Sequence, residues 1–126
     1  MPASESLGSL EQLILTAVDA LKDKAYGAQV YDLACEFAGR ELNAGSIYVT
    51  LERLYKKGYL VAVDAKEVPD RGRQPTKIYK LTPEGNAALL NSTRTQRRMH
   101  RSYFSRRRRE WHLIQKEELQ EEKGTA

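Results

Sequence analysis

Residues 43–60 read NAGSIYVTLERLYKKGYL, and this stretch decides the fold. Asn43 is a favourable helix N-cap, because its side-chain oxygen can accept a hydrogen bond from an unpaired N–H group of the first turn. Gly58 suits the left-handed position that follows a last helical turn. Between these ends, apolar residues recur at i, i+4 and i+7, which gives one stripe: Ile47, Leu51 and Leu54. We predict a helix that packs through this stripe.

The opposite arc of the predicted helix carries two cations, a hydroxyl and a small apolar side chain: Ser46, Val49, Arg53 and Lys56. Such groups can meet phosphates and base edges in the major groove of DNA. We assign base readout to Ser46, Val49 and Thr50, on or beside this arc and near the helix N-terminus. Tyr48 and Tyr55 lie beside the apolar stripe, and for these rings packing at the helix edge and contact with DNA stay open as equal alternatives.

The charge distribution supports this reading. The 126 residues carry a net charge of only +4. Residues 1–42 hold three basic and seven acidic residues, net −4, whereas residues 43–82 hold eight and four, net +4. Residues 83–126 hold ten and six, again net +4. The positive charge therefore begins at the predicted helix. The acidic first third argues against a protein that binds anions non-specifically over its whole surface.

Composition bounds the class of protein. A hydrophobic content of 40% in 126 residues allows one small domain with a modest core. Cys35 is the single cysteine, so an intrachain disulfide is impossible and a reducing compartment is indicated. We expect Cys35 to be a buried structural thiol. No apolar run can span a bilayer, and the N-terminus lacks the features of a signal peptide, so we expect a cytoplasmic protein with no membrane partner.

Two helices are predicted before the organising stretch. Residues 7–21 show helical apolar spacing, and Ser9 with Gln12 can form a capping box. The apolar arc of this first helix is broad, so either it is buried within one chain or a second chain covers part of it. Residues 28–38 form the second predicted helix, and residues 40–42 connect it to the organising stretch. Two helices joined so closely are typical of a helix-turn-helix.

A two-stranded hairpin is predicted next, with strands at residues 59–63 and 76–81 and a long polar tip at residues 66–75. The tip suits a wing that follows a phosphate backbone, although a solvated loop is the alternative. Tyr79 is expected to pack under the wing. The cations expected to contact phosphates come from the helix and the wing together: Arg53, Lys56, Lys57, Arg71, Arg73 and Lys77.

The last third of the chain predicts one long helix, or two with a bend, from Pro83 to about Leu119. Thr82 is a good N-cap, and Pro83 and Glu84 suit the first turn. Residues 94–109 contain eight arginines and no acid, and this block either lies near DNA or faces solvent. The apolar residues of this region need a partner to bury them, and a second copy is the economical one.

We assign a dimer interface, or a chamber for a small aromatic ligand between subunits, to apolar residues of the first and last predicted helices: Leu10, Ile14, Met99, Tyr103, Phe104, Trp111 and Ile114. The ligand chamber is inferred from aromatic surface that nothing else uses.

Several motifs, in order along residues 7–90, resemble the PadR-type transcriptional regulators. They are Leu10-Glu11 with Leu13-Ile14-Leu15, Tyr26-Gly27, Gly45-Ser46-Ile47-Tyr48 with Leu51, Arg53 and Leu54, Gly58-Tyr59-Leu60, Gly72-Arg73, and Lys77-Ile78-Tyr79-Lys80-Leu81-Thr82-Pro83-Glu84-Gly85. The short C-terminal region is similar to the smaller subgroup, which has a single dimerising helix. Two departures are the arginine-rich region and the absence of a clear counterpart to the mid-helix tryptophan of some drug-binding relatives.

The resemblance implies a homodimeric winged helix-turn-helix repressor, a palindromic operator in double-stranded DNA and often a small aromatic inducer. It implies that the helix matching residues 44–57 enters the major groove and that the first and last helices make the dimer. The expected fold is mainly α with a small β-hairpin. A winged helix-turn-helix DNA-binding domain is expected over residues 1–82, and a C-terminal dimerisation helix with a polar tail over residues 83–126.

Two other classes of function compete with a DNA-binding regulator. An RNA- or protein-binding winged helix could use the same basic face. An enzyme is disfavoured, because no nucleophile–base pair and no phosphate-binding glycine loop is present in the sequence. His100 and His112 are not spaced to bind one metal ion, so neither a metal nor a cofactor is expected.

Overall fold

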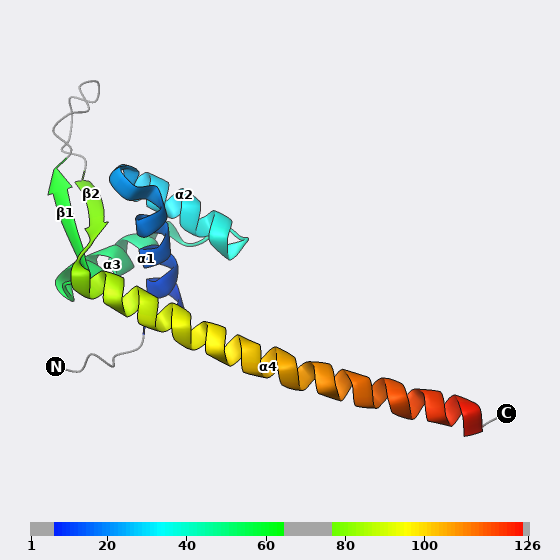
Figure 1. Ribbon diagram of the computed structural model, residues 1–126. Coiled ribbons are helices and arrows are strands. Elements are labelled where there is room, and N and C mark those ends of the chain that lie inside the picture. The colour runs from blue at the N-terminus through cyan, green and yellow to red at the C-terminus, as the bar shows by residue number, and fades with distance from the viewer. Residues whose placement is uncertain (1–6, 65–76, 125–126) are drawn as a thin grey trace. The chain divides into compact units, whose positions relative to one another are not determined.

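The computed structural model describes residues 7–64 and 77–124. It is mainly helical with one β-hairpin and a long C-terminal helix, which confirms the predicted fold class (Figure 1). The elements in chain order are α1 (Ser9–Leu21), the 3₁₀ turn η1 (Lys22–Lys24), α2 (Gly27–Ala38), α3 (Ala44–Lys56), β1 (Leu60–Asp64), β2 (Lys77–Leu81) and α4 (Pro83–Gly124).

The core forms where α1 packs against α2, α3 and β2. Its largest fully buried side chains come from these helices and from β1: Ile14, Leu15, Val18, Val30, Ile47, Leu51, Leu54 and Leu60. Ile14 is 0% exposed, so its assignment to a dimer interface or ligand chamber is wrong. The core of its own chain covers that side chain, which leaves no surface for a partner. Leu10 is only partly buried and stays available.

The turn between α2 and α3 is fixed through the backbone of Leu42. Gly39 ends α2 in the left-handed region, with φ +72°. The Leu42 N–H then donates to Cys35 Sγ at 3.3 Å, and the Tyr31 hydroxyl donates to the Leu42 carbonyl at 2.8 Å. Cys35 is thus a structural residue, although it is partly rather than fully buried. These bonds set where α3 begins.

The hairpin pairs β1 and β2 antiparallel, with Leu60 opposite Leu81 and Asp64 opposite Lys77. The Tyr79 N–H donates to the Ala25 carbonyl at 3.0 Å, so the segment before α2 joins the free edge of β2. Tyr79 is partly buried against the core, as predicted. The expectations for the wing tip, including Arg71 and Arg73, lie outside the described residues.

The start of α4 is fastened to the hairpin. The Gly85 N–H donates to Thr82 Oγ1 at 3.0 Å, which confirms Thr82 as the N-cap, and the same hydroxyl donates to the Gly58 carbonyl at 2.6 Å. A Cβ on Gly85 would overlap the backbone carbonyl of Tyr59, so only glycine fits there. This packing makes the first turns of α4 part of the core, and Leu89 is buried.

The chain divides into two compact units, residues 1–92 and residues 93–126. The first unit therefore includes the beginning of α4, with Ser92 Oγ donating to Gln12 Oε1 at 2.6 Å. In the second unit, the described side chains from Arg94 onward are exposed. None of the described helices is apolar over a length that would cross a bilayer.

Candidate nucleic-acid interface

Helix α3 is positioned as its sequence predicts. Asn43 Oδ1 accepts the Ser46 N–H at 3.0 Å, so Asn43 is the N-cap. The three residues of the apolar stripe are each 0% exposed. Gly58 has φ +83°, the left-handed conformation expected just after the last turn. One face of α3 is therefore buried in the core, and the opposite face is exposed.

The opposite face, which we call the α3 arc, is exposed along the helix. It consists of Ser46, Val49, Glu52, Arg53 and Lys56. Val49 is 58% exposed. Small apolar groups in such a position can contact the methyl group of thymine. The arc thus presents cations, a hydroxyl, a carboxylate and an apolar contact on one surface.

Glu52 is the member of the α3 arc that the sequence reasoning missed. It lies three residues after Val49 and four before Lys56, a spacing that places it on the same face. The prediction for this face included only cations, a hydroxyl and an apolar side chain. A carboxylate can accept a hydrogen bond from the amino group of cytosine, so Glu52 extends the chemistry available for base recognition.

Thr50 does not belong to the exposed surface, and its assignment to base readout is corrected. Its side chain is 3% exposed, and its hydroxyl donates to the Ser46 carbonyl at 2.7 Å. The position is three residues after Ile47 and four before Leu54, which places it on the packed stripe. A hydroxyl bonded inside the helix cannot reach a base.

Tyr48 packs at the edge of α3 while keeping about half of its surface exposed. A Cβ on Gly27 would lie 2.9 Å from Tyr48 Cε1, so the ring rests on the start of α2. Burial, followed by the charges of Glu52 and Tyr48, raises the pKa of Tyr79. Tyr79 on β2 therefore lies near these two residues of α3. Tyr48 and Tyr55 are each 48% exposed, which leaves part of each ring free to contact a ligand.

Lys57 also has a partner within the fold. Its ammonium lies 2.8 Å from Glu11 Oε2, and the two side chains are 31% and 11% exposed. Burial opposes ionisation of Glu11, yet hydrogen bonds from Lys57 and Gly8, with the charges of Lys57 and Arg53, lower its pKa overall. Lys57 thus forms an ion pair between α3 and α1, and its phosphate contact stays a prediction.

The other predicted positions that the structure describes are exposed, apart from the partly buried Leu10. Lys77 stands exposed at the start of β2. Five residues of the proposed dimer or ligand surface lie in the second unit and are 46% to 59% exposed: Met99, Tyr103, Phe104, Trp111 and Ile114. In the first unit, Leu10 lines a groove with Leu13 and Ile47. Within residues 7–64 and 77–124, no three histidine, cysteine or acidic residues gather where they could hold a metal ion.

Comparisons with known proteins agree with this geometry. A family model described as the transcriptional regulator PadR-like family matches residues 14–91. A PadR family transcription regulator from Clostridium difficile R20291 is 25% identical with a TM-score of 0.61, over 78% of this chain and 97% of that chain. RosR of H. salinarum is 26% identical with a TM-score of 0.57, over 74% and 76% of the two chains.

A third structure shares the fold alone. BpsR of Bordetella bronchiseptica, whose DNA binding is regulated by 6-hydroxynicotinic acid, is 18% identical with a TM-score of 0.57, over 82% of this chain and 69% of that chain. Among curated proteins, none matches this chain. The family model covers more than half of the sequence and includes the whole helix-turn-helix and hairpin. The prediction of a regulator rather than an enzyme is thereby confirmed, and the chain belongs to the PadR-like family of transcriptional regulators.

Proposed function

We propose that this protein is a homodimeric repressor that recognises a palindromic operator through α3 and occludes it. The observation that carries the proposal is the division of α3 into two faces. The stripe of Ile47, Leu51 and Leu54 is fully buried, whereas the α3 arc is exposed along the same helix. A helix presented in this way by a helix-turn-helix is suited to the major groove.

The proposed contacts divide by chemistry. Ser46, Val49 and Glu52 would meet base edges, because they provide a hydroxyl, an apolar group and a carboxylate. Arg53 and Lys56 would meet phosphates and supply the salt-dependent part of the affinity. Lys77 would join them from the wing, and the same role stays predicted for Arg71 and Arg73, outside the described residues.

The proposal includes two copies of the chain. A palindromic operator matches a dimer with two-fold symmetry, and its half-sites lie about 34 Å apart, one turn of DNA. The exposed apolar residues of α4 would supply the contact between copies. The same aromatic surface, in particular Phe104 and Trp111, would bind a small aromatic effector, and a cytoplasmic location would give access to DNA.

A titration of the operator tests this proposal. Arg53→Ala should weaken binding at least about tenfold while the circular dichroism spectrum and the melting temperature stay unchanged, because Arg53 is exposed and outside the core. Lys24→Ala is the matched control, since it removes an exposed cation outside α3 and should leave affinity within about twofold. Equal affinity of the Arg53→Ala and wild-type proteins would remove α3 from the interface.

A further inference from the structure

The second unit concentrates arginine on one face of α4. Residues 94–109 contain eight arginines and no acid. Because successive residues of an α-helix are about 100° apart, six of these arginines fall within an arc of about 120°. These six residues, which we call the basic stripe, are Arg94, Arg97, Arg98, Arg101, Arg108 and Arg109. Their side chains are exposed. The other two arginines, Arg106 and Arg107, lie outside the arc.

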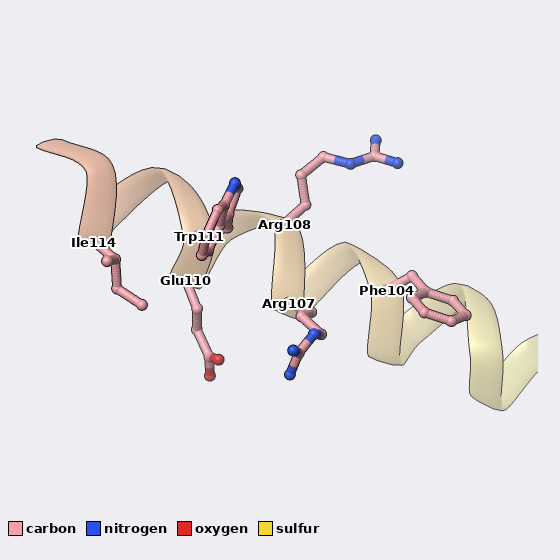
Figure 2. Close-up of a pocket in the computed structure, with 6 residues that line it drawn as sticks. All are labelled: Phe104, Arg107, Arg108, Glu110, Trp111 and Ile114. Atoms are coloured by element: carbon pink, nitrogen blue, oxygen red, sulfur yellow. The ribbon is translucent and has the colours of Figure 1, made fainter.

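The acidic residues of the same unit are absent from this arc. Its five glutamates all lie at least about 80° from the centre of the arc: Glu110, Glu117, Glu118, Glu121 and Glu122. Lys116 follows the first glutamate and lies within the arc, which extends the positive charge over about 33 Å of helix. Figure 2 shows the division at one level of α4, where Arg108 extends to one side and Arg107 and Glu110 extend to the other. The charges are therefore separated by face.

The basic stripe is electrostatically unfavourable for the helix that carries it. Arg94 and Arg98 are four residues apart, as are Arg97 and Arg101, and like charges at this spacing destabilise a helix. None of the six stripe residues has an acid three or four residues away in the sequence, the spacing at which ion pairs form along a helix. Arg106 and Arg107, by contrast, precede Glu110 by four and three residues. A bound polyanion would supply the opposite charge that the stripe lacks.

The basic stripe would stay uncovered in the homodimer proposed above. The apolar residues Met99, Tyr103 and Ile114 lie at least about 140° from the centre of the arc, on the opposite side of α4. Two copies that pair through these residues would leave the stripe facing away from the contact. The stripe is therefore available to a partner other than a second copy.

The chemistry of the stripe favours duplex DNA as that partner. Guanidinium groups bind phosphate oxygens with two parallel hydrogen bonds. No tyrosine, phenylalanine or tryptophan lies within the arc, so the stripe offers no such ring on which the bases of a single strand could stack. A membrane would require an apolar opposite face, whereas that face also carries Glu110 and Glu117. The length of about 33 Å is close to one turn of duplex DNA.

We propose that the basic stripe of α4 binds the phosphate backbone of duplex DNA without regard to base sequence. The proposal goes beyond the proposed function, because these contacts come from the second unit and read no bases. The stripe contributes to affinity for any duplex and makes that affinity dependent on salt. It would hold the protein on DNA while α3 supplies the selection of the operator.

Two matched double substitutions test the proposal by titration of a labelled random-sequence duplex. Arg108→Gln with Arg109→Gln removes two charges from the stripe, and it should weaken binding at least about tenfold. It should also reduce the slope of log affinity against log salt by about 2, because each phosphate contact contributes about 0.9. Arg106→Gln with Arg107→Gln removes the same charge from outside the stripe and should stay within about twofold of wild type. An equal loss in the two proteins, or no loss in either, would overturn the proposal.

The other end of the stripe provides an independent measurement. Arg94→Gln with Arg98→Gln should weaken binding of the random duplex as much as the pair at 108 and 109 does. All these variants should keep the circular dichroism spectrum and melting temperature of wild type, because the side chains are exposed. Wild-type affinity after the substitutions at 94 and 98 would overturn the assignment of one continuous surface.

A competition experiment distinguishes duplex DNA from other polyanions. Unlabelled random duplex should displace the labelled duplex from the wild-type protein. At the same phosphate concentration, a single strand or vesicles containing phosphatidylglycerol should displace it at least about tenfold less effectively. Displacement by either competitor as effective as that by the duplex would overturn the choice of partner.

The ratio of operator affinity to random-duplex affinity separates this inference from the proposed function. The stripe substitutions should lower both affinities by the same factor and leave the ratio unchanged. Val49→Ala should lower the ratio, because Val49 is proposed to contact a base edge. A stripe variant that loses operator affinity alone would overturn binding without regard to sequence. An unchanged ratio for Val49→Ala would count against base reading by α3 and leave the stripe intact.

Discussion

Lys57 Nζ lies 2.8 Å from Glu11 Oε2, and this ion pair ties the C-terminal end of α3 to the first turn of α1. The other carboxylate oxygen of Glu11 accepts the Gly8 N–H at 3.0 Å, so both oxygens have partners. Lys56, the preceding residue, is exposed on the α3 arc. Two adjacent lysines thus serve different purposes, one holding the helix in place and the other facing outward.

Exchanging each lysine for alanine separates these purposes. Lys57→Ala should lower the free energy of unfolding by about 1–3 kcal/mol, because it leaves a largely buried carboxylate without its cation. Lys56→Ala should change that free energy by less than about 0.5 kcal/mol and reduce the slope of log affinity against log salt by about 1. Urea denaturation and salt titrations measure both. An equal loss of stability in the two variants would contradict the assignment.

The same pair predicts a pH dependence of folding. Burial raises the pKa of Glu11, but Lys57, the Gly8 N–H and the charge of Arg53 lower it by more. The pKa of Glu11 in the folded state therefore lies below the ordinary value of 4.5. A lowered pKa contributes stability that is present above pH 4.5 and is lost as the pH falls through the folded-state value. Glu11→Gln should therefore lose less stability than wild type on acidification from pH 6 to pH 3, as judged by urea denaturation. An equal loss of stability in the wild-type and Glu11→Gln proteins between pH 6 and pH 3 would contradict this role of the Glu11 carboxylate.

Gly85 is predicted to be intolerant of any side chain. Gly85→Ala should destabilise the first unit by more than about 2 kcal/mol, because the added Cβ would overlap the Tyr59 carbonyl and force α4 away from the hairpin. Asn86→Ala, at an exposed neighbouring position of the same turn, is the control and should be nearly neutral. A Gly85→Ala protein with the melting temperature of wild type would contradict this packing of α4 against Tyr59.

Tyr31 is predicted to stabilise the turn that precedes α3. Tyr31→Phe removes the donor to the Leu42 carbonyl and should cost about 1–2 kcal/mol, because that carbonyl belongs to a largely buried residue. Tyr55→Phe removes the hydroxyl of a ring that is 48% exposed and should cost less than about 0.5 kcal/mol. Thermal denaturation of both proteins provides the comparison, and equal melting temperatures would exclude a structural role for the Tyr31 hydroxyl.

Local signals in the sequence were sufficient to predict α3. Its N-cap, apolar stripe and final glycine are contained in residues 43–58 and act through neighbours within a few residues. Thr50 was misplaced although the same spacing puts it beside Ile47 and Leu54. Its hydroxyl suggested a polar surface, but a threonine in a helix can satisfy that group with the carbonyl four residues earlier.

Local sequence patterns do not predict contacts between distant parts of the chain. Glu11 and Lys57 are 46 residues apart, and no local pattern pairs them. The same holds for Tyr48 on Gly27 and for Gly85 against Tyr59, which depend on how the elements pack. Ile14 illustrates a related limit of sequence reasoning. Helical spacing reveals an apolar face, but it does not show whether the same chain or a second chain covers that face.

Selection from a random pool of duplex DNA tests the central claim most directly, namely that the α3 arc reads DNA in a symmetric pair. The wild-type protein should enrich an inverted repeat with half-sites about one helical turn apart. Val49→Ala or Glu52→Gln should change the preferred bases within each half-site and leave the spacing unchanged. Recovery of no common sequence, or of one that neither substitution alters, would contradict the account.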